Sequence, residues 1–120
     1  MKNIKKIYAC WAYVSDLEAS KNFFESLGFV SKFRQDDWIE FDLGATSFAI
    51  LKRPPEKGNV VPQKTRIMFE VEDIKRMFST LVANNVRIIG DIRDEHYGKL
   101  LTFEDLDGNW FEFFENKSKR

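Results

Sequence analysis

The sequence predicts an α+β fold in which two βαβββ modules form a curved mixed sheet. The first observation is that a strand-like run, an amphipathic helix and three further strand-like runs follow one another twice. The second is that Val-Ser-Asp-Leu at 14–17 recurs as Val-Glu-Asp-Ile at 71–74, 57 positions later. Internal repetition of this kind indicates a duplicated unit more strongly than any single segment does.

A chain of 120 residues suits a single domain, since it is too short for two ordinary ones. We therefore expect one domain over residues 1–120. Its first module occupies about residues 5–51, a linker about 52–64 and the second module about 65–115. The linker contains all three prolines, which disfavour regular structure.

The first module begins with a β-branched and aromatic run at residues 7–14, which predicts a strand. Ser15 and Glu18 have the spacing of a capping box, so a helix is expected to begin at Asp16 or Leu17. Gly28 is expected to end it. Three strands are then predicted at residues 29–33, 37–43 and 46–51.

The second module repeats this order, with a strand at residues 66–71 and Asp73 as the N-cap of a helix. Asn84 and Asn85 are expected to end the helix. Strands are predicted at residues 86–89, 100–103 and 110–114, with a loop at residues 91–97.

The charge balance argues against nucleic acid as a partner, because 19 Lys and Arg offset 19 Asp and Glu. No apolar run is long enough to span a bilayer, so no membrane contact and a cytoplasmic location are expected. The single cysteine, Cys10, is interpreted as a small core residue.

Three stretches together resemble the vicinal oxygen chelate superfamily: YVSDLEASKNFFESLGF, FEVEDIKRMFSTL and YGKLLTFEDLDGNWFEFFE. This superfamily includes glyoxalase I, extradiol dioxygenases, and fosfomycin and bleomycin resistance proteins. The compact length is most similar to small bleomycin-resistance-like and glyoxalase-like proteins. The resemblance implies the glyoxalase/bleomycin resistance fold, with the whole chain as one domain of this type, and a homodimer as the common assembly.

In metal-dependent members, the resemblance implies that each module offers one metal ligand from its first strand and one from its last. Carried onto this sequence, the first-strand positions are Ala9 and Arg66, and the last-strand positions are Ala49 or Ile50 and Glu112. Only Glu112 has a side chain that binds metals. We therefore expect no metal cofactor. The alternative is one divalent metal ion held by relocated ligands, namely Glu70, His96 and Glu112.

Strand periodicity places alternate side chains on the same face of a sheet. Aromatic walls with a few charges suit a flat, amphipathic or cationic molecule. The predicted ligand-binding residues are Trp11, Tyr13, Trp38, Arg66, Glu70, Trp110 and Glu112. An Arg66–Glu112 ion pair is expected where the family places its metal, and Phe111 and Phe113 are expected to point toward the helix.

Three functions are consistent with this pattern. The first is metal-free binding or sequestration of an aromatic or amphipathic small molecule, as in antibiotic resistance. The second is a metal-dependent lyase, isomerase or dioxygenase, so whether the protein is an enzyme stays open. The third is an interaction module whose aromatic face serves an obligate dimer, because aromatic residues at period two are also common in interfaces.

Overall fold

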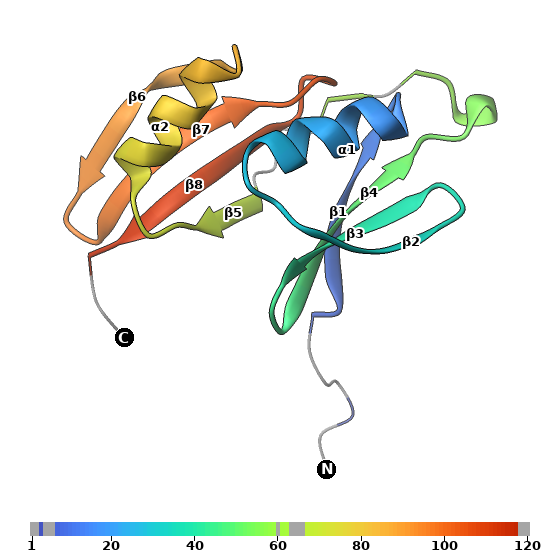
Figure 1. Cartoon of the computed structure of the whole chain (residues 1–120), viewed down its shortest axis with the longest axis horizontal. Helices are drawn as coiled ribbons and strands as arrows, with labels where there is room; N and C mark the ends of the chain where they lie inside the picture. Colours follow the sequence, from blue (N-terminus) through green and yellow to red (C-terminus); the bar gives the residue numbers. More distant parts are fainter. Residues whose placement is uncertain (1–2, 4–6, 60, 63–66, 118–120) are drawn as a thin grey trace. The chain divides into compact units, whose positions relative to one another are not determined.

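The computed structural model describes residues 3, 7–59, 61–62 and 67–117, and the chain divides into two compact units, Met1–Val60 and Val61–Arg120. Unit one runs through β1 (Ala9–Val14), α1 (Leu17–Ser26), β2 (Ser31–Gln35), β3 (Trp38–Leu43), β4 (Thr46–Lys52) and a short 3-10 helix, η1 (Pro55–Lys57). Unit two runs through β5 (Ile67–Glu70), α2 (Ile74–Ala83), β6 (Arg87–Glu95), β7 (Gly98–Glu104) and β8 (Trp110–Asn116) (Figure 1).

Each unit has its own four-stranded mixed sheet, and the two sheets share one topology. The strand order is β1-β4-β3-β2 in unit one and β5-β8-β7-β6 in unit two. The first and last strands of each unit pair in parallel, and the other pairs are antiparallel. The predicted α+β fold with two βαβββ modules is therefore confirmed, as two mixed sheets with one helix each.

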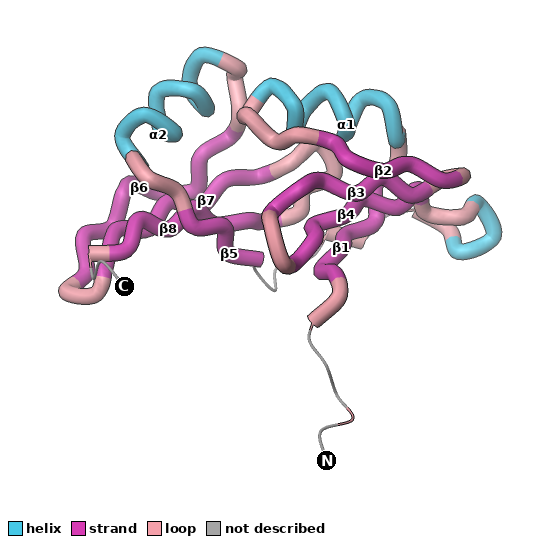
Figure 2. Tube along the Cα trace, turned by 60° about the horizontal axis from the view of Figure 1, so that its bottom comes forward, coloured by secondary structure: helices cyan, strands magenta, loops and turns pink. Residues whose placement is uncertain are grey.

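In unit one, α1 lies along one face of the sheet (Figure 2), and buried side chains from the helix and the strands form the core. Phe24 of α1 is fully buried, with its ring centroid 5.2 Å from that of Phe48 and 5.7 Å from that of Phe41. Ile39 and Ile50 are buried on the same side of the sheet. Burial of such large side chains stabilises a fold by about 1.5–3 kcal/mol each.

In unit two, α2 covers the equivalent face, and phenylalanines again form the core. The Phe103 ring stacks on Phe111 and Phe113, with centroid distances of 5.7 and 4.7 Å. Ile74 and Leu81 of α2 are fully buried. The expectation that Phe111 and Phe113 point toward the helix is confirmed. Within the described residues, neither helix is long and apolar enough to cross a membrane.

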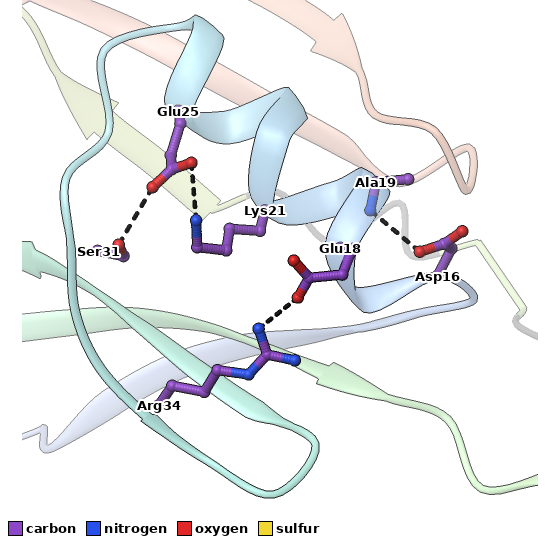
Figure 3. Close-up of polar contacts among 7 residues, drawn as sticks. All are labelled: Asp16, Glu18, Ala19, Lys21, Glu25, Ser31 and Arg34. Atoms are coloured by element: carbon purple, nitrogen blue, oxygen red, sulfur yellow. Dashed lines mark hydrogen bonds and ion pairs between the residues drawn. The ribbon is translucent and has the colours of Figure 1, made fainter.

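The N-terminus of α1 differs in detail from the predicted capping box. Asp16, not Ser15, is the N-cap residue, and its carboxylate accepts a hydrogen bond from the Ala19 N–H at 3.0 Å (Figure 3). The Asp16 backbone is extended, as an N-cap must be. Glu18 instead forms an ion pair with Arg34 of β2, which ties the helix to the edge of its sheet.

The N-terminus of α2 is capped as predicted by Asp73, which accepts from the Arg76 N–H at 3.1 Å. A carboxylate from β8 adds to this cap, since Glu115 accepts from the Ile74 N–H at 2.9 Å. Two of the N–H groups that a helix start leaves without backbone partners are thus satisfied. The helix ends at Ala83 with Asn84 as its C-cap, and Asn85 follows with a positive φ of 57°.

A tight turn at residues 105–109 joins β7 to β8. The Asp105 carboxylate accepts hydrogen bonds from the backbone N–H groups of Asp107 and Asn109, at 3.0 and 2.8 Å, and from the Asn109 side-chain amide at 2.9 Å. Burial raises the pKa of Asp105, although these three hydrogen bonds favour its ionised form. The turn therefore has a structural role, because its hydrogen bonds fix the chain just before β8.

One prediction for unit two is wrong: most of residues 91–97 belong to a strand. β6 continues to Glu95, and its register with β7 shifts between Ile89 and Arg93. Gly90 lies in this irregular stretch with a φ of 76°, which glycine adopts without strain. Charged residues at a bulge on an edge strand resemble a loop in sequence, and the strand was missed for that reason.

We expect Gly98→Ala to lower the free energy of unfolding by about 1–3 kcal/mol, the usual cost of overpacking. A Cβ at Gly98 would lie 2.5 Å from the Glu115 carbonyl oxygen and would also meet the Phe114 ring. Urea denaturation measures this change. The control is Lys99→Ala in the next position of β7, for which a change of about 0.5 kcal/mol or less is expected. Equal stability of the two variants would contradict the crowding argument.

Candidate functional site

The sheet face of unit one that lies opposite α1 carries the predicted aromatic residues. The strand register places Trp11 opposite Ala49, and Ala49 opposite Glu40. The next row places Tyr13 opposite Leu51, and Leu51 opposite Trp38. We call this surface the aromatic face, defined by Trp11, Tyr13, Phe33, Trp38, Glu40, Ala49 and Leu51.

Three aromatic rings on this face lie close to one another. Trp11 meets Tyr13 edge to face, with ring centroids 4.9 Å apart, and lies 6.3 Å from Trp38. The guanidinium of Arg53 lies 4.9 Å from the centroid of Tyr13 and makes a cation–π contact. Trp11 remains 40% exposed, so a large aromatic surface is accessible.

Glu40 is the buried carboxylate of the aromatic face, with 5% of its surface exposed. One of its oxygens, Oε2, accepts hydrogen bonds from the Trp38 indole N–H at 2.9 Å and the Tyr8 hydroxyl at 3.4 Å. The Trp38 hydrogen bond, with further contributions from Ser47, Lys32 and Tyr8, outweighs desolvation and lowers the pKa of Glu40. The carboxylate is therefore ionised at neutral pH.

An open pocket of ≈ 540 Å³ lies beside Glu40 within unit one. It is formed at the ends of β2 and β3 and the turn between them. Its lining residues are Tyr8, Phe33, Gln35, Asp36, Asp37, Trp38, Glu40 and Leu51. The lining combines aromatic and apolar surface with three carboxylates, and it contains no Lys or Arg.

The prediction placed Trp11, Tyr13 and Trp38 in the site, and the structure brings these three together. Tyr8 and Glu40 are not among the predicted ligand-binding residues. The alternation of Trp38, Glu40 and Asp42 in β3 was the signal for Glu40, because it places that carboxylate on the same face as Trp38. Tyr8 precedes β1, and its contact with Glu40 has no pattern in the sequence.

Glu112 of β8 lies in unit two, on the sheet face opposite α2, and is also buried. Its carboxylate forms an ion pair with Arg93 of β6 at 2.6 Å and accepts from the Thr102 hydroxyl at 3.1 Å. Arg93 also lies 3.2 Å from the Thr102 hydroxyl oxygen. Arg66, the predicted partner, lies outside the described residues. Arg93 was missed because its strand had been interpreted as a loop.

The other predicted residues of unit two have separate environments. Trp110 donates its indole N–H to Glu104 at 3.0 Å. Glu70 is exposed on β5, and His96 is exposed in the turn after β6, with its ring edge-on to Tyr97. Within the described part of the chain, no three His, Cys, Asp or Glu side chains are grouped to hold a metal ion. Glu70, His96 and Glu112 are therefore not brought together as such a group.

The positions that the family uses for metal ligands do not fit a metal here. The repeat allows positions in the two units to be matched: Trp11 and Met68 are equivalent, since each lies six residues before its helix. Trp11 pairs with Ala49 on the last strand of unit one, and Met68 pairs with Glu112 on the last strand of unit two. The structure thus identifies Ala49, rather than Ile50, as the counterpart of Glu112. Ala9 and Ala49 have no donor side chain, and Glu112 is paired with Arg93.

Solved structures with the same fold include an antibiotic binding protein, a glyoxalase family protein and an oxidase. TnmS3, an antibiotic binding protein from Streptomyces sp. CB03234, is 22% identical, and the match covers 98% of this chain and 100% of that protein with a TM-score of 0.80. A glyoxalase family protein from Bacillus anthracis has the same identity and coverage, with a TM-score of 0.79. The oxidase ChaP-H2 is 19% identical over 93% of this chain and 94% of that protein, with a TM-score of 0.77. At these identities the likeness shows the fold.

Sequence comparison gives two further findings. The uncharacterized protein YetH of Bacillus subtilis (strain 168) is 31% identical in an alignment 116 residues long, which covers 90% of this chain and 96% of YetH. The model of the Glyoxalase/Bleomycin resistance protein/Dioxygenase superfamily matches residues 6–113. This match spans most of the chain, so the protein belongs to the glyoxalase/bleomycin resistance protein/dioxygenase superfamily.

Proposed function

We propose that this protein binds a flat aromatic or amphipathic small molecule on the aromatic face of unit one, without a metal and without transforming the ligand. The observation that carries the proposal is the partly exposed group of Trp11, Tyr13 and Trp38 beside an open pocket. An indole that stays 40% exposed leaves apolar surface in contact with water. Covering it with a second ring system is favourable through both area burial and ring stacking.

The chemistry of the family's metal positions supports the metal-free form of this proposal. A divalent metal needs several oxygen, nitrogen or sulfur donors in fixed geometry. Ala9 and Ala49 supply none, and the charge of Glu112 is balanced by Arg93. TnmS3, an antibiotic binding protein, has the same fold, so a binding function is compatible with this architecture.

We expect acridine, a flat aromatic compound that is largely uncharged at neutral pH, to bind the protein after dialysis against EDTA. Isothermal titration calorimetry is the measurement. Trp11→Leu is expected to weaken binding about tenfold, because it removes one ring from the stacking surface. The matched control is Tyr97→Leu, which removes an exposed aromatic ring from unit two. The control variant is expected to bind as the unaltered protein does.

The same titration distinguishes the metal-dependent alternative. If acridine binding required added zinc, nickel, manganese or iron(II), the metal-free proposal would be wrong. Equal affinities for Trp11→Leu and the unaltered protein would place the binding surface elsewhere.

The ionised state of Glu40 leads to a prediction about acid stability. A carboxylate whose pKa is lower in the folded than in the unfolded chain stabilises the fold above the unfolded pKa, about 4.3 for Glu. This stabilisation is lost as the pH falls through the folded pKa. We therefore expect the unaltered protein to lose more stability below about pH 4.3 than Glu40→Gln does. Thermal unfolding across this pH range is the measurement, and parallel curves would show that Glu40 makes no such contribution.

A further inference from the structure

We propose that the pocket beside Glu40 binds the protonated nitrogen of an organic cation, with Glu40 as the group that recognises the charge. The inference rests on the proposed function and narrows it, because it gives the ligand of the aromatic face a positively charged end. Its basis is the combination of a buried carboxylate, neutral hydrogen-bond donors and a pocket with aromatic and acidic walls.

The first step concerns the charge of Glu40. A buried carboxylate is usually paired with a cation, because removing a charge from water is costly. The side chains that hydrogen-bond to Glu40 are those of Tyr8, Trp38 and Ser47, and all three are neutral. Among the described residues, no Lys, Arg or His lies within ion-pair distance of Glu40. The hydrogen bonds hold the carboxylate in place, but they do not neutralise its charge.

The second step concerns the pocket walls. Asp36 and Asp37, in the turn between β2 and β3, add two exposed carboxylates to the lining. Two basic residues of β2 are nearby: Arg34 forms an ion pair with Glu18 of α1, and Lys32 acts on the charge of Glu40 from an exposed position outside the lining, without forming an ion pair with it. The pocket therefore has a negative potential that attracts cations and repels anions.

The third step concerns the kind of cation. Inorganic divalent cations prefer several oxygen ligands around one point, and Glu40 is the only buried carboxylate in this lining. An organic ammonium needs fewer ligands, since one carboxylate and neighbouring aromatic faces satisfy it. Tyr8, Phe33 and Trp38 supply aromatic surface in the lining, and Leu51 supplies apolar surface. An aromatic or amphipathic molecule with a protonated nitrogen therefore matches both the carboxylate of Glu40 and the aromatic and apolar surface of the pocket.

The experiment compares two probes with the same ring system. 9-Aminoacridine is protonated at neutral pH, whereas acridine is largely uncharged there. Isothermal titration calorimetry of the full chain is expected to show that 9-aminoacridine binds about ten- to hundredfold more tightly, as one charge-assisted hydrogen bond implies. Glu40→Gln is expected to abolish this preference, because it weakens the binding of 9-aminoacridine far more than the binding of acridine. Gln keeps an oxygen that accepts from the Trp38 indole N–H.

A second variant keeps the test valid if Glu40→Gln fails to fold. In the double variant Asp36→Asn with Asp37→Asn, both changes are exposed, and asparagine tolerates the positive φ of 54° at position 36. This variant is expected to reduce 9-aminoacridine affinity about threefold at low salt, with the difference shrinking in high salt. Acridine affinity is expected to change less than 9-aminoacridine affinity does.

The outcomes separate this inference from the proposed function. If both probes bind with equal affinity, the cation inference is wrong and the aromatic binding function stands. If 9-aminoacridine binds more tightly but Glu40→Gln and the double Asp variant both retain that preference, the carboxylates of this pocket do not recognise the charge. If neither probe binds the unaltered protein, both proposals are overturned.

Discussion

Each unit of this protein has one helix and one four-stranded sheet, so its helix can cover only one of the two sheet faces. This constraint arises because the only α-helix described in each unit lies between the first and second strands and packs on one face of the sheet. The first and last strands pair in parallel, and the intervening chain includes the single helix that packs on the sheet. The covered faces hold the phenylalanine cores. The opposite faces are left for other purposes, and the two units use them differently.

The sheet face opposite α1 carries aromatic rings in unit one, and the sheet face opposite α2 carries a polar network in unit two. The equivalences follow from the register: the row Trp11, Ala49, Glu40 in unit one corresponds to the row Met68, Glu112, Thr102 in unit two. A carboxylate thus occupies a different strand in each row. The two units therefore share a backbone topology and a phenylalanine core on the helix-covered face. The side chains on the opposite sheet face differ between the units without altering that core.

Much of the fold was accessible from the sequence because the repeat and the strand alternation are both local patterns. The helices begin at Leu17 and Ile74, the equivalent positions of the predicted repeat. The bulge in β6 was not accessible, because it depends on pairing with β7 rather than on the composition of residues 91–97. The cap of α1 was assigned one residue early for a similar reason: Glu18 pairs with Arg34 of β2, a partner that a capping-box pattern does not include.

The candidate site was accessible only in part. Periodicity grouped Trp11 with Tyr13, because residues two apart on a strand share a face. The Glu112–Arg93 pair depends on the missed part of β6, and so it could not be predicted. The contact between Tyr8 and Glu40 joins a residue before β1 to the middle of β3, which is a property of the folded sheet.

The two buried carboxylates explain why unit one, rather than unit two, carries the proposed cation pocket. Glu112 forms an ion pair with the Arg93 guanidinium, so its charge is balanced within unit two. Glu40 accepts hydrogen bonds from neutral N–H and O–H donors, which hold the carboxylate in place without balancing its charge. A carboxylate fixed by hydrogen bonds is already oriented, and a cation that binds it does not have to pay for ordering that side chain. The arrangement around Glu40 is therefore suited to recognition of an external cation, and the arrangement around Glu112 to stabilisation of the sheet.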